Sequence, residues 1–288
     1  MARLNRKVRV ASLSIISNTA LIIFKVIAGV LSGSVSIISE AIHSGMDLIA
    51  SIIAFFSVKE SAKPADEKHP YGHGKVENMS ALIEGLLIFV AAIMIITEVI
   101  KKLIEPTELE QTNIAMEVMF ISAFINWMVS RKLYKVAKEE DSMALEADAL
   151  HLKTDVYTSL GVGLGILLIK LTGFTILDPI VAILVALLII KEAWVLCKNA
   201  FDFLLDSKLP DKEVAEVKKI LLNHSHQFID YHKLKTRRSG NMKHIDFHIT
   251  VPADLTAKEI HDIIGSLKKD MNETLKNTRV YIHVDPSQ

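Results

Sequence analysis

Six long stretches of mostly apolar residues occupy the first two thirds of the chain. They cover residues 10–31, 35–57, 80–104, 112–130, 143–171 and 176–196. A helix needs roughly 20 apolar residues to cross a bilayer core of about 30 Å. The pattern therefore predicts six transmembrane helices, and we expect the first to be retained as a span rather than cleaved as a signal peptide.

The pattern changes near Lys208. Helical periodicity in "PDKEVAEVKKILLN" is followed by strand-like alternation in "DYHKLKTRRSG" and "NMKHIDFHITV", then by a second helix in "TAKEIHDIIGSLKKDMNETL" and a last strand in "RVYIHVD". The predicted fold class is a membrane α-helical bundle of six transmembrane helices followed by a cytoplasmic α+β ferredoxin-like (αββαβ) domain. We place the two domains at residues 1–206 and 207–288.

Positive charge predicts the orientation. The short segments 58–78 and 131–138 are rich in Lys and Arg, which favour the cytoplasmic side of a membrane. Lys101 and Lys102, at the opposite end of the third span, run against this pattern. We expect a multi-pass protein of the cell inner (plasma) membrane, surrounded by the lipid bilayer, with both termini cytoplasmic.

Composition narrows the classes of partner and site. Half of the 288 residues are hydrophobic and 23% are charged, and the mean hydropathy is +0.34, which suits membrane spans joined to a soluble part. The formal net charge of +0 gives no basis for a nucleic-acid partner. Because Cys197 is the only cysteine, any metal site must use His, Asp and Glu.

Ionisable residues interrupt the second and fifth spans in one repeated pattern. "SEAIHSGMDL" and "DALHLKTD" each place an acid, a His three residues later and an Asp four residues after that, on one helix face. Each charge at bilayer depth costs at least about 2.5 kcal/mol on insertion scales. The six residues are Glu40, His43, Asp47, Asp148, His151 and Asp155.

Pairing among these groups, or snorkelling to water, would explain one such helix, but two matched helices favour a metal site. His nitrogen and Asp oxygen suit Zn²⁺, and four such ligands from two helices complete a tetrahedron. The predicted tetrad is His43, Asp47, His151 and Asp155. We expect Glu40 and Asp148, a turn away, to support the site or lie on its access path.

Two other functions are compatible with the same residues. "EAIH" is also the Glu-x-x-His motif of di-iron carboxylate bundles, so the protein could be a membrane di-iron oxidase. That function needs bridging carboxylates, for which Glu84 and Glu117 are candidates, and Asp148 is one carbon shorter than the Glu it requires. A membrane sensor that binds metal without moving it is the other alternative.

Further candidate ligands lie outside the spans. The loop "DEKHPYGHGKVE" contains Asp66, His69 and His73 beside glycines that allow tight folding around an ion, although such histidines are often simply solvated. In the second domain, alternation places several His and Asp side chains on strand faces, and two more histidines could join them. These are His244, Asp246, His248, His283 and Asp285, with His232 and His261. We expect Lys25, inside the first span, to reach a membrane interface.

At these motifs the chain resembles the cation diffusion facilitators, a family of divalent-metal/proton antiporters that work as homodimers. The resemblance covers the six spans, both ligand pairs, "HPYGHGKVE" and the ending "YIHVDP". It implies a transport site at the tetrad, a loop site at Asp66, His69 and His73, and zinc ligands at a cytoplasmic dimer interface. The last set is His232, His248, His261, His283 and Asp285.

The expected activity is efflux of cytosolic Zn²⁺ in exchange for protons by alternating access. With ordinary pKa values of about 6.5 for His and about 3.9 for Asp, His43 and His151 are the expected proton carriers. Related bacterial exporters often have Asp where His43 stands, so the resemblance leaves Zn²⁺, Fe²⁺, Cd²⁺ and Co²⁺ open as cargo. Mn²⁺, which favours oxygen-rich sites, fits less well. Metal in the cytoplasmic domain would regulate transport.

Overall fold

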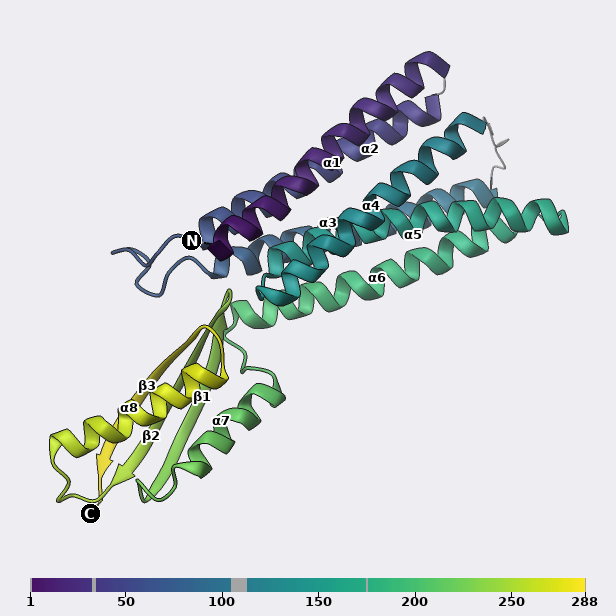
Figure 1. The fold of residues 1–288 in the computed structure, drawn as a ribbon. Coiled ribbons are helices and arrows are strands. Elements are labelled where there is room, and N and C mark those ends of the chain that lie inside the picture. The colour runs from purple at the N-terminus through teal and green to yellow at the C-terminus, as the bar shows by residue number, and fades with distance from the viewer. Residues whose placement is uncertain (1, 33–34, 105–112, 175, 288) are drawn as a thin grey trace. The chain divides into compact units, whose positions relative to one another are not determined.

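The computed structural model describes residues 2–32, 35–104, 113–174 and 176–287 (Figure 1). The chain divides into two compact units, residues 1–201 and 202–288, and each is described by itself.

Within the described residues, the first unit is built from six long helices. Their bounds are α1 Ala2–Ser32, α2 Val35–Ser61, α3 Lys75–Ile104, α4 Asn113–Glu139, α5 Met143–Thr172 and α6 Leu177–Leu204. Several helices extend past the predicted apolar stretches, as α4 does to Glu139, because charged residues with good helix propensity continue the helix into water.

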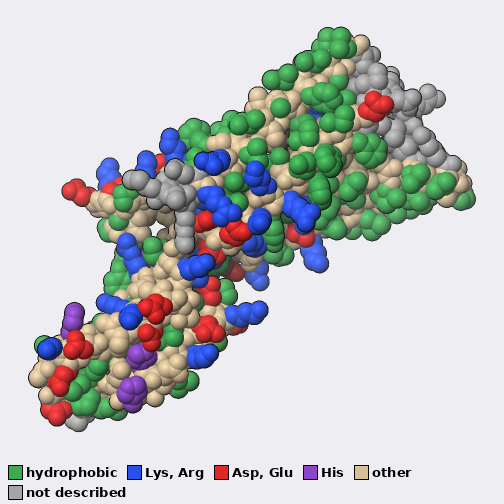
Figure 2. Space-filling model, viewed as in Figure 1, with side chains coloured by type: hydrophobic (Ala, Val, Ile, Leu, Met, Phe, Trp, Pro, Cys, Tyr) green, Lys and Arg blue, Asp and Glu red, His purple; other side chains and the backbone are tan. Residues whose placement is uncertain are grey.

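Four of these helices are long and apolar enough to cross a membrane: segments Arg6–Leu31, Ala41–Ser61, Lys75–Lys101 and Pro179–Leu204. The described residues of α4 and α5 do not include a complete run of this kind. Large apolar side chains such as Leu31, Phe56 and Trp194 are exposed on the unit, and Figure 2 shows many hydrophobic side chains over its visible face. This surface suits contact with lipid; the count of six spans stays a prediction.

Two helix pairs organise the first unit. Helix α1 runs along α2, and α4 runs along α5, while α3 contacts both α2 and α5 (Figure 1). Small residues allow close approach of the helices. A Cβ on Gly85 of α3 would lie 2.6 Å from Cys197 Sγ of α6, and a Cβ on Gly161 of α5 would lie 2.8 Å from Val185 Cγ2.

A buried ion pair joins the ends of several helices. Lys7 Nζ of α1 donates to Glu77 Oε1 of α3 at 3.0 Å, and both side chains are almost fully buried. Ser61 of α2 and Ser142, beside the start of α5, also donate to the Glu77 carboxylate. A paired and hydrogen-bonded charge is tolerated inside a protein, whereas an unpaired one is costly, so this network holds four segments in one arrangement.

The second unit has the predicted element order, which is confirmed. Helix α7 (Asp211–Asn223) is followed by β1 (Asp230–Ser239), β2 (Met242–Val251), α8 (Ala257–Thr274) and β3 (Thr278–Pro286). The sheet order is β1-β2-β3, with β1 antiparallel and β3 parallel to β2. Helix α8 begins with a capping box between Thr256 and Glu259.

One face of this sheet is covered and the other carries polar residues. Alternate β2 side chains, including Ile245, Phe247 and Ile249, are buried with Leu221 of α7 and Leu267 of α8 in a single core. The intervening positions of β2 point to the opposite face. That face carries the histidines of the candidate cytoplasmic site.

Candidate metal centre

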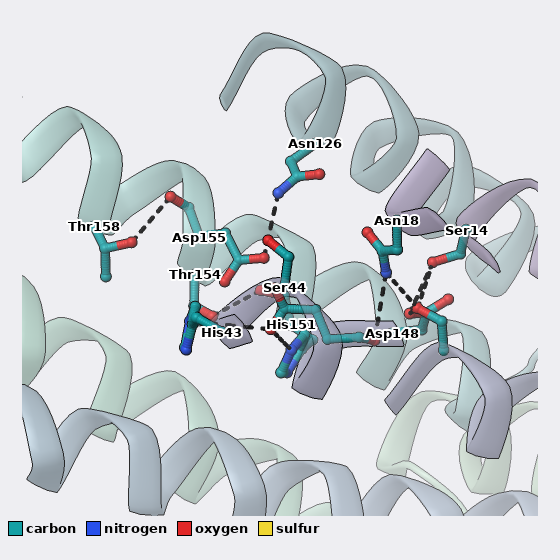
Figure 3. A network of polar contacts seen from close by, with 12 residues as sticks. Ser14, Asn18, His43, Ser44, Asn126, Asp148, His151, Thr154, Asp155 and Thr158 are labelled. Carbon is teal, nitrogen blue, oxygen red and sulfur yellow. Dashed lines mark hydrogen bonds and ion pairs between the residues drawn. The ribbon is translucent and has the colours of Figure 1, made fainter. Parts of the chain in front are cut away.

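The central contact of the first unit joins α2 to α5. His151 Nε2 lies 3.0 Å from Asp47 Oδ1, and both residues are buried (Figure 3). His43, one turn before Asp47, brings its Nε2 within 4.0 Å of the same oxygen, although its side chain is 56% exposed. The two helices therefore bring the predicted residues to one place.

Asp155 completes the group from the next turn of α5. Its carboxylate, the His43 ring and the Asp47 carboxylate offer ligand atoms that all lie within 4.8 Å of one another. His151 joins them through its bond to Asp47. The four side chains supply two imidazole nitrogens and two carboxylates, a donor set that fits a four-coordinate transition-metal ion as cargo.

Polar residues outside the repeated motif contact these candidate ligands. Asn126 Nδ2 of α4 donates to Asp155 Oδ2 at 3.3 Å (Figure 3). The hydroxyls of Thr154 and Thr158 donate hydrogen bonds to the backbone carbonyls of His151 and Asp155, respectively. Sequence reasoning missed Asn126, and its only signal was an amide inside an apolar span.

A second polar group surrounds Asp148, one turn before His151. Asp148 is fully buried, and its Oδ1 accepts hydrogen bonds from Ser14 of α1 and Ser51 of α2, each at 3.0 Å. Asn18 of α1 donates to Ser51 Oγ at 2.8 Å. Asp148 therefore lies within the bundle. The side chain of Glu40, expected in a similar role, lies outside the described residues.

Lys25 is buried as well, so the expectation that it reaches a membrane interface is wrong. Its Nζ donates to Ser44 Oγ of α2 at 2.8 Å, and only 6% of the residue is exposed. The hydroxyl lies next to His43 in sequence and accepts the ammonium inside the α1–α2 pair. This contact holds the lysine within the bundle.

The loop between α2 and α3 brings its three predicted ligands together. Asp66 Oδ1 lies 3.2 Å from His69 Nδ1, and Asp66 Oδ2 lies 3.3 Å from His73 Nε2. Gly72 turns the chain there with φ +86°, a conformation that L side chains rarely adopt. The backbone N–H of His69 donates to Asp66, which lowers the pKa of this carboxyl from its ordinary value.

In the second unit, register places three histidines abreast across the sheet. His232 of β1 pairs with His248 of β2, which pairs with His283 of β3. A bulge between His232 and Lys235 changes the local direction of β1, a device that re-aims side chains.

Asp285 connects the three rings. Its carboxylate lies 3.0 Å from His248, 3.2 Å from His283 and 3.3 Å from His232. The pKa of Asp285 is lowered, first because His248 hydrogen-bonds to it and also through the charges of the neighbouring histidines. Three nitrogens and a carboxylate form a donor set that fits Zn²⁺.

Three predicted candidates lie outside this group. His261 is exposed on α8. His244 and Asp246 precede His248 on β2, opposite Arg237 and Lys235. Burial, followed by the charges of Arg237 and Arg279, lowers the pKa of His244. This histidine is 1% exposed, and it belongs to none of the potential metal groups among the described residues.

Two family models match the chain in the order of its two units. Residues 11–205 match the cation efflux transmembrane domain, and residues 209–287 match the cytoplasmic domain of cation efflux proteins. This chain belongs to the cation efflux family. The resemblance to cation diffusion facilitators is thereby confirmed.

Relatives within the cation efflux family match along nearly the whole chain. An uncharacterised transporter of Methanocaldococcus jannaschii is 36% identical, covering 95% of this chain and 96% of the relative. The cation-efflux pump FieF of Pectobacterium atrosepticum is 30% identical, covering 96% and 93%. The manganese efflux system protein MneP of Bacillus subtilis is also 30% identical, covering 96% and 95%.

Membership makes this chain a multi-pass membrane transporter of cations rather than an enzyme. The di-iron oxidase alternative is therefore wrong. Its required bridging residues are also unsuited, because Glu117 is exposed and Glu84 belongs to none of the potential metal groups among the described residues.

Proposed function

We propose that this cation efflux protein exports cytosolic divalent metal, with Zn²⁺ as its main cargo, in exchange for protons. The observation that carries the proposal is the convergence of two His–Asp pairs from α2 and α5 inside the helical unit. The donor set of His43, Asp47, His151 and Asp155 suits Zn²⁺ and also admits Fe²⁺, Cd²⁺ and Co²⁺. Mn²⁺ is the cargo named for one relative and prefers sites richer in oxygen.

The same four groups would couple metal to protons. Metal binding needs neutral imidazole and ionised carboxylate, so protons and metal compete for one site. In the proposed cycle, cytosolic metal displaces protons from His43 and His151, the helices rock to expose the site outward, and protons from outside release the metal. Asp47 bonds to His151 Nε2, and Asn126 donates to Asp155. Residues of this chain therefore position both His151 and Asp155.

The proposed topology follows from charge and from the family. Six spans in residues 1–206 would place both termini in the cytoplasm of a cell whose inner membrane holds the protein. Residues 207–288 would form a cytoplasmic metal-binding and dimerisation domain of a homodimer.

Metal bound at the sheet of the second unit would bridge or order two protomers and shift the conformational equilibrium of the transport helices. Its occupancy would then report the concentration of cytosolic metal. The proposed ligands are His232, His248, His261, His283 and Asp285, with a separate loop site at Asp66, His69 and His73. His261 is exposed on α8, outside the three histidines that Asp285 connects, so it suits a ligand donated to a partner protomer.

The deciding experiment is Zn²⁺ uptake into proteoliposomes under an imposed proton gradient. Parent protein is compared with Asp47→Ala and Asp155→Ala, and with Glu117→Ala as a control at an exposed position. Gradient-dependent uptake that is lost in the two site variants and kept in the control would support antiport through this site. Metal binding by the parent without any flux would overturn it in favour of a sensor.

A further inference from the structure

Two buried carboxyls lie beside the metal tetrad and have no role in it so far. Asp148 of α5 and Glu84 of α3 are both fully buried. Asp148 Oδ1 accepts from Ser14 and Ser51, and Glu84 Oε1 accepts from Ser80 at 2.9 Å. The other oxygen of each group, Asp148 Oδ2 and Glu84 Oε2, is buried without a hydrogen-bond partner among the described residues.

The two carboxyls are close enough to repel each other, and each also interacts electrostatically with His151. His151, which interacts with both carboxyls, is itself bonded to Asp47 of α2. From α1, the neutral Ser14 donates to Asp148 and the neutral Asn18 donates to Ser51, and α6 places the Cys197 thiol beside Gly85.

No lysine or arginine neutralises the pair within the part of the chain that the structure describes. Lys7 is bonded to Glu77, and Lys25 donates to Ser44. Two adjacent carboxylates cannot both stay ionised in such an interior, because each charge loses its hydration and repels the other. Protonation of one carboxyl removes the repulsion between the two negative charges. It also gives the pair an O–H donor, which two ionised carboxylates lack.

We propose that Glu84 and Asp148 form a second, proton-binding site next to the metal tetrad, and this rests on the proposed metal/proton exchange. Asp148 lies one helical turn from His151, so a divalent ion in the tetrad repels the proton on the pair. Metal arrival therefore drives off this proton as well as those on the ligands, and metal departure allows it to return. The pair adds to the number of protons that move with each metal ion without touching the metal.

The test measures proton and metal movement together in proteoliposomes, with Zn²⁺ as the probe and one dye inside for each ion. Glu84→Gln and Asp148→Asn keep the size and hydrogen-bonding capacity of the side chains but bind no proton. We expect each variant to move about one proton fewer per Zn²⁺ than the parent. Glu98→Gln, an exposed change on the same helix as Glu84, should keep the parent ratio. An unchanged ratio in both site variants overturns the proposal while leaving antiport intact.

Infrared difference spectra of purified full-length protein, with and without Zn²⁺, keep the test decisive if a variant does not transport. The parent should lose the carbonyl stretch of a protonated carboxylic acid when Zn²⁺ binds, and Glu84→Gln or Asp148→Asn should lack that change. Retention of the full band change in both variants rejects the pair as the proton site. A parent protein that binds Zn²⁺ but shows no proton-coupled flux defeats the proposed function instead.

Discussion

The two His–Asp clusters use similar ligands in opposite environments. In the helical unit, the side chains of Asp47 and His151 are 6% and 10% exposed, although that of His43 is 56% exposed, and Asn126 of a neighbouring helix donates to Asp155. On the open sheet face, the side chains of His248, Asp285 and His283 are 27%, 37% and 64% exposed. Water can solvate the second cluster when it is empty, but it reaches little of the Asp47–His151 contact.

This difference in exposure means that the buried cluster needs a bound cation or proton, whereas the exposed cluster can be vacant. A buried carboxylate with no cation or proton is costly, so under the proposed exchange the cluster of α2 and α5 would hold either metal or protons. The solvated cluster loses little by emptying, and its occupancy can follow the metal concentration around it. Exchange suits transport, and variable occupancy suits sensing.

Removal of a tetrad carboxylate should have the largest effect. Asp47→Ala deletes a ligand and leaves His151 without its bonding partner, so we expect Zn²⁺ flux to fall by more than about 100-fold. Flux assays in proteoliposomes measure this, with Glu117→Ala as the exposed control. Substantial remaining flux in Asp47→Ala would remove the tetrad from the transport path.

The matching change in the solvated cluster should affect binding and spare maximal transport. Asp285 contacts all three histidines, so Asp285→Ala should weaken metal binding at that site about 10- to 100-fold. Equilibrium binding to full-length protein checks the affinity, and flux at saturating Zn²⁺ checks transport. Equal losses of flux in Asp285→Ala and Asp47→Ala would contradict the division between the two clusters.

A change in a supporting residue should be weaker than a change in a ligand. Asn126→Ala removes the amide that donates to Asp155 but keeps all four ligands, so metal affinity at the tetrad should drop about tenfold. The affinity is obtained from the Zn²⁺ dependence of flux. Ser122→Ala, on the same helix, is the control, because its buried hydroxyl oxygen has no described bonding partner.

The smallest effect concerns pH and the buried His244. Because burial lowers its pKa in the folded protein, protonation favours the unfolded chain. The parent should therefore lose stability as pH falls below about 6.5, by at most about 1.4 kcal/mol per pH unit for this group, and should be unaffected by it above that pH. Thermal unfolding with chelator should show a smaller acid loss in His244→Gln; identical pH profiles would contradict this.

Periodicity placed the candidate ligands side by side, because residues three or four apart on a helix share a face. His43 with Asp47, and His151 with Asp155, needed only that rule and the cost of charge in a span. Alternation likewise placed His283 and Asp285 together on β3. These relations lie within single elements.

Contacts between elements could not be predicted in the same way. Asn126, Ser14 and Asn18 reach the site because of how α4 and α1 are rotated against α5 and α2, which long-range packing decides. The alignment of His232, His248 and His283 depends on strand register and on a bulge. A polar residue in an apolar run, such as Lys25, reveals that it needs a partner but not which helix supplies it.

The bond between Lys7 and Glu77 also bears on how the protein is made. A ribosome completes α1 long before it adds the first turn of α3, so the lysine has no carboxylate partner when its helix enters the bilayer. Its ammonium therefore stays at the membrane–water interface until α3 has been inserted. Final assembly of the bundle would then be a separate step that follows insertion. A chain stalled before that step would expose the unpaired ammonium of Lys7 to the quality-control machinery of the cell.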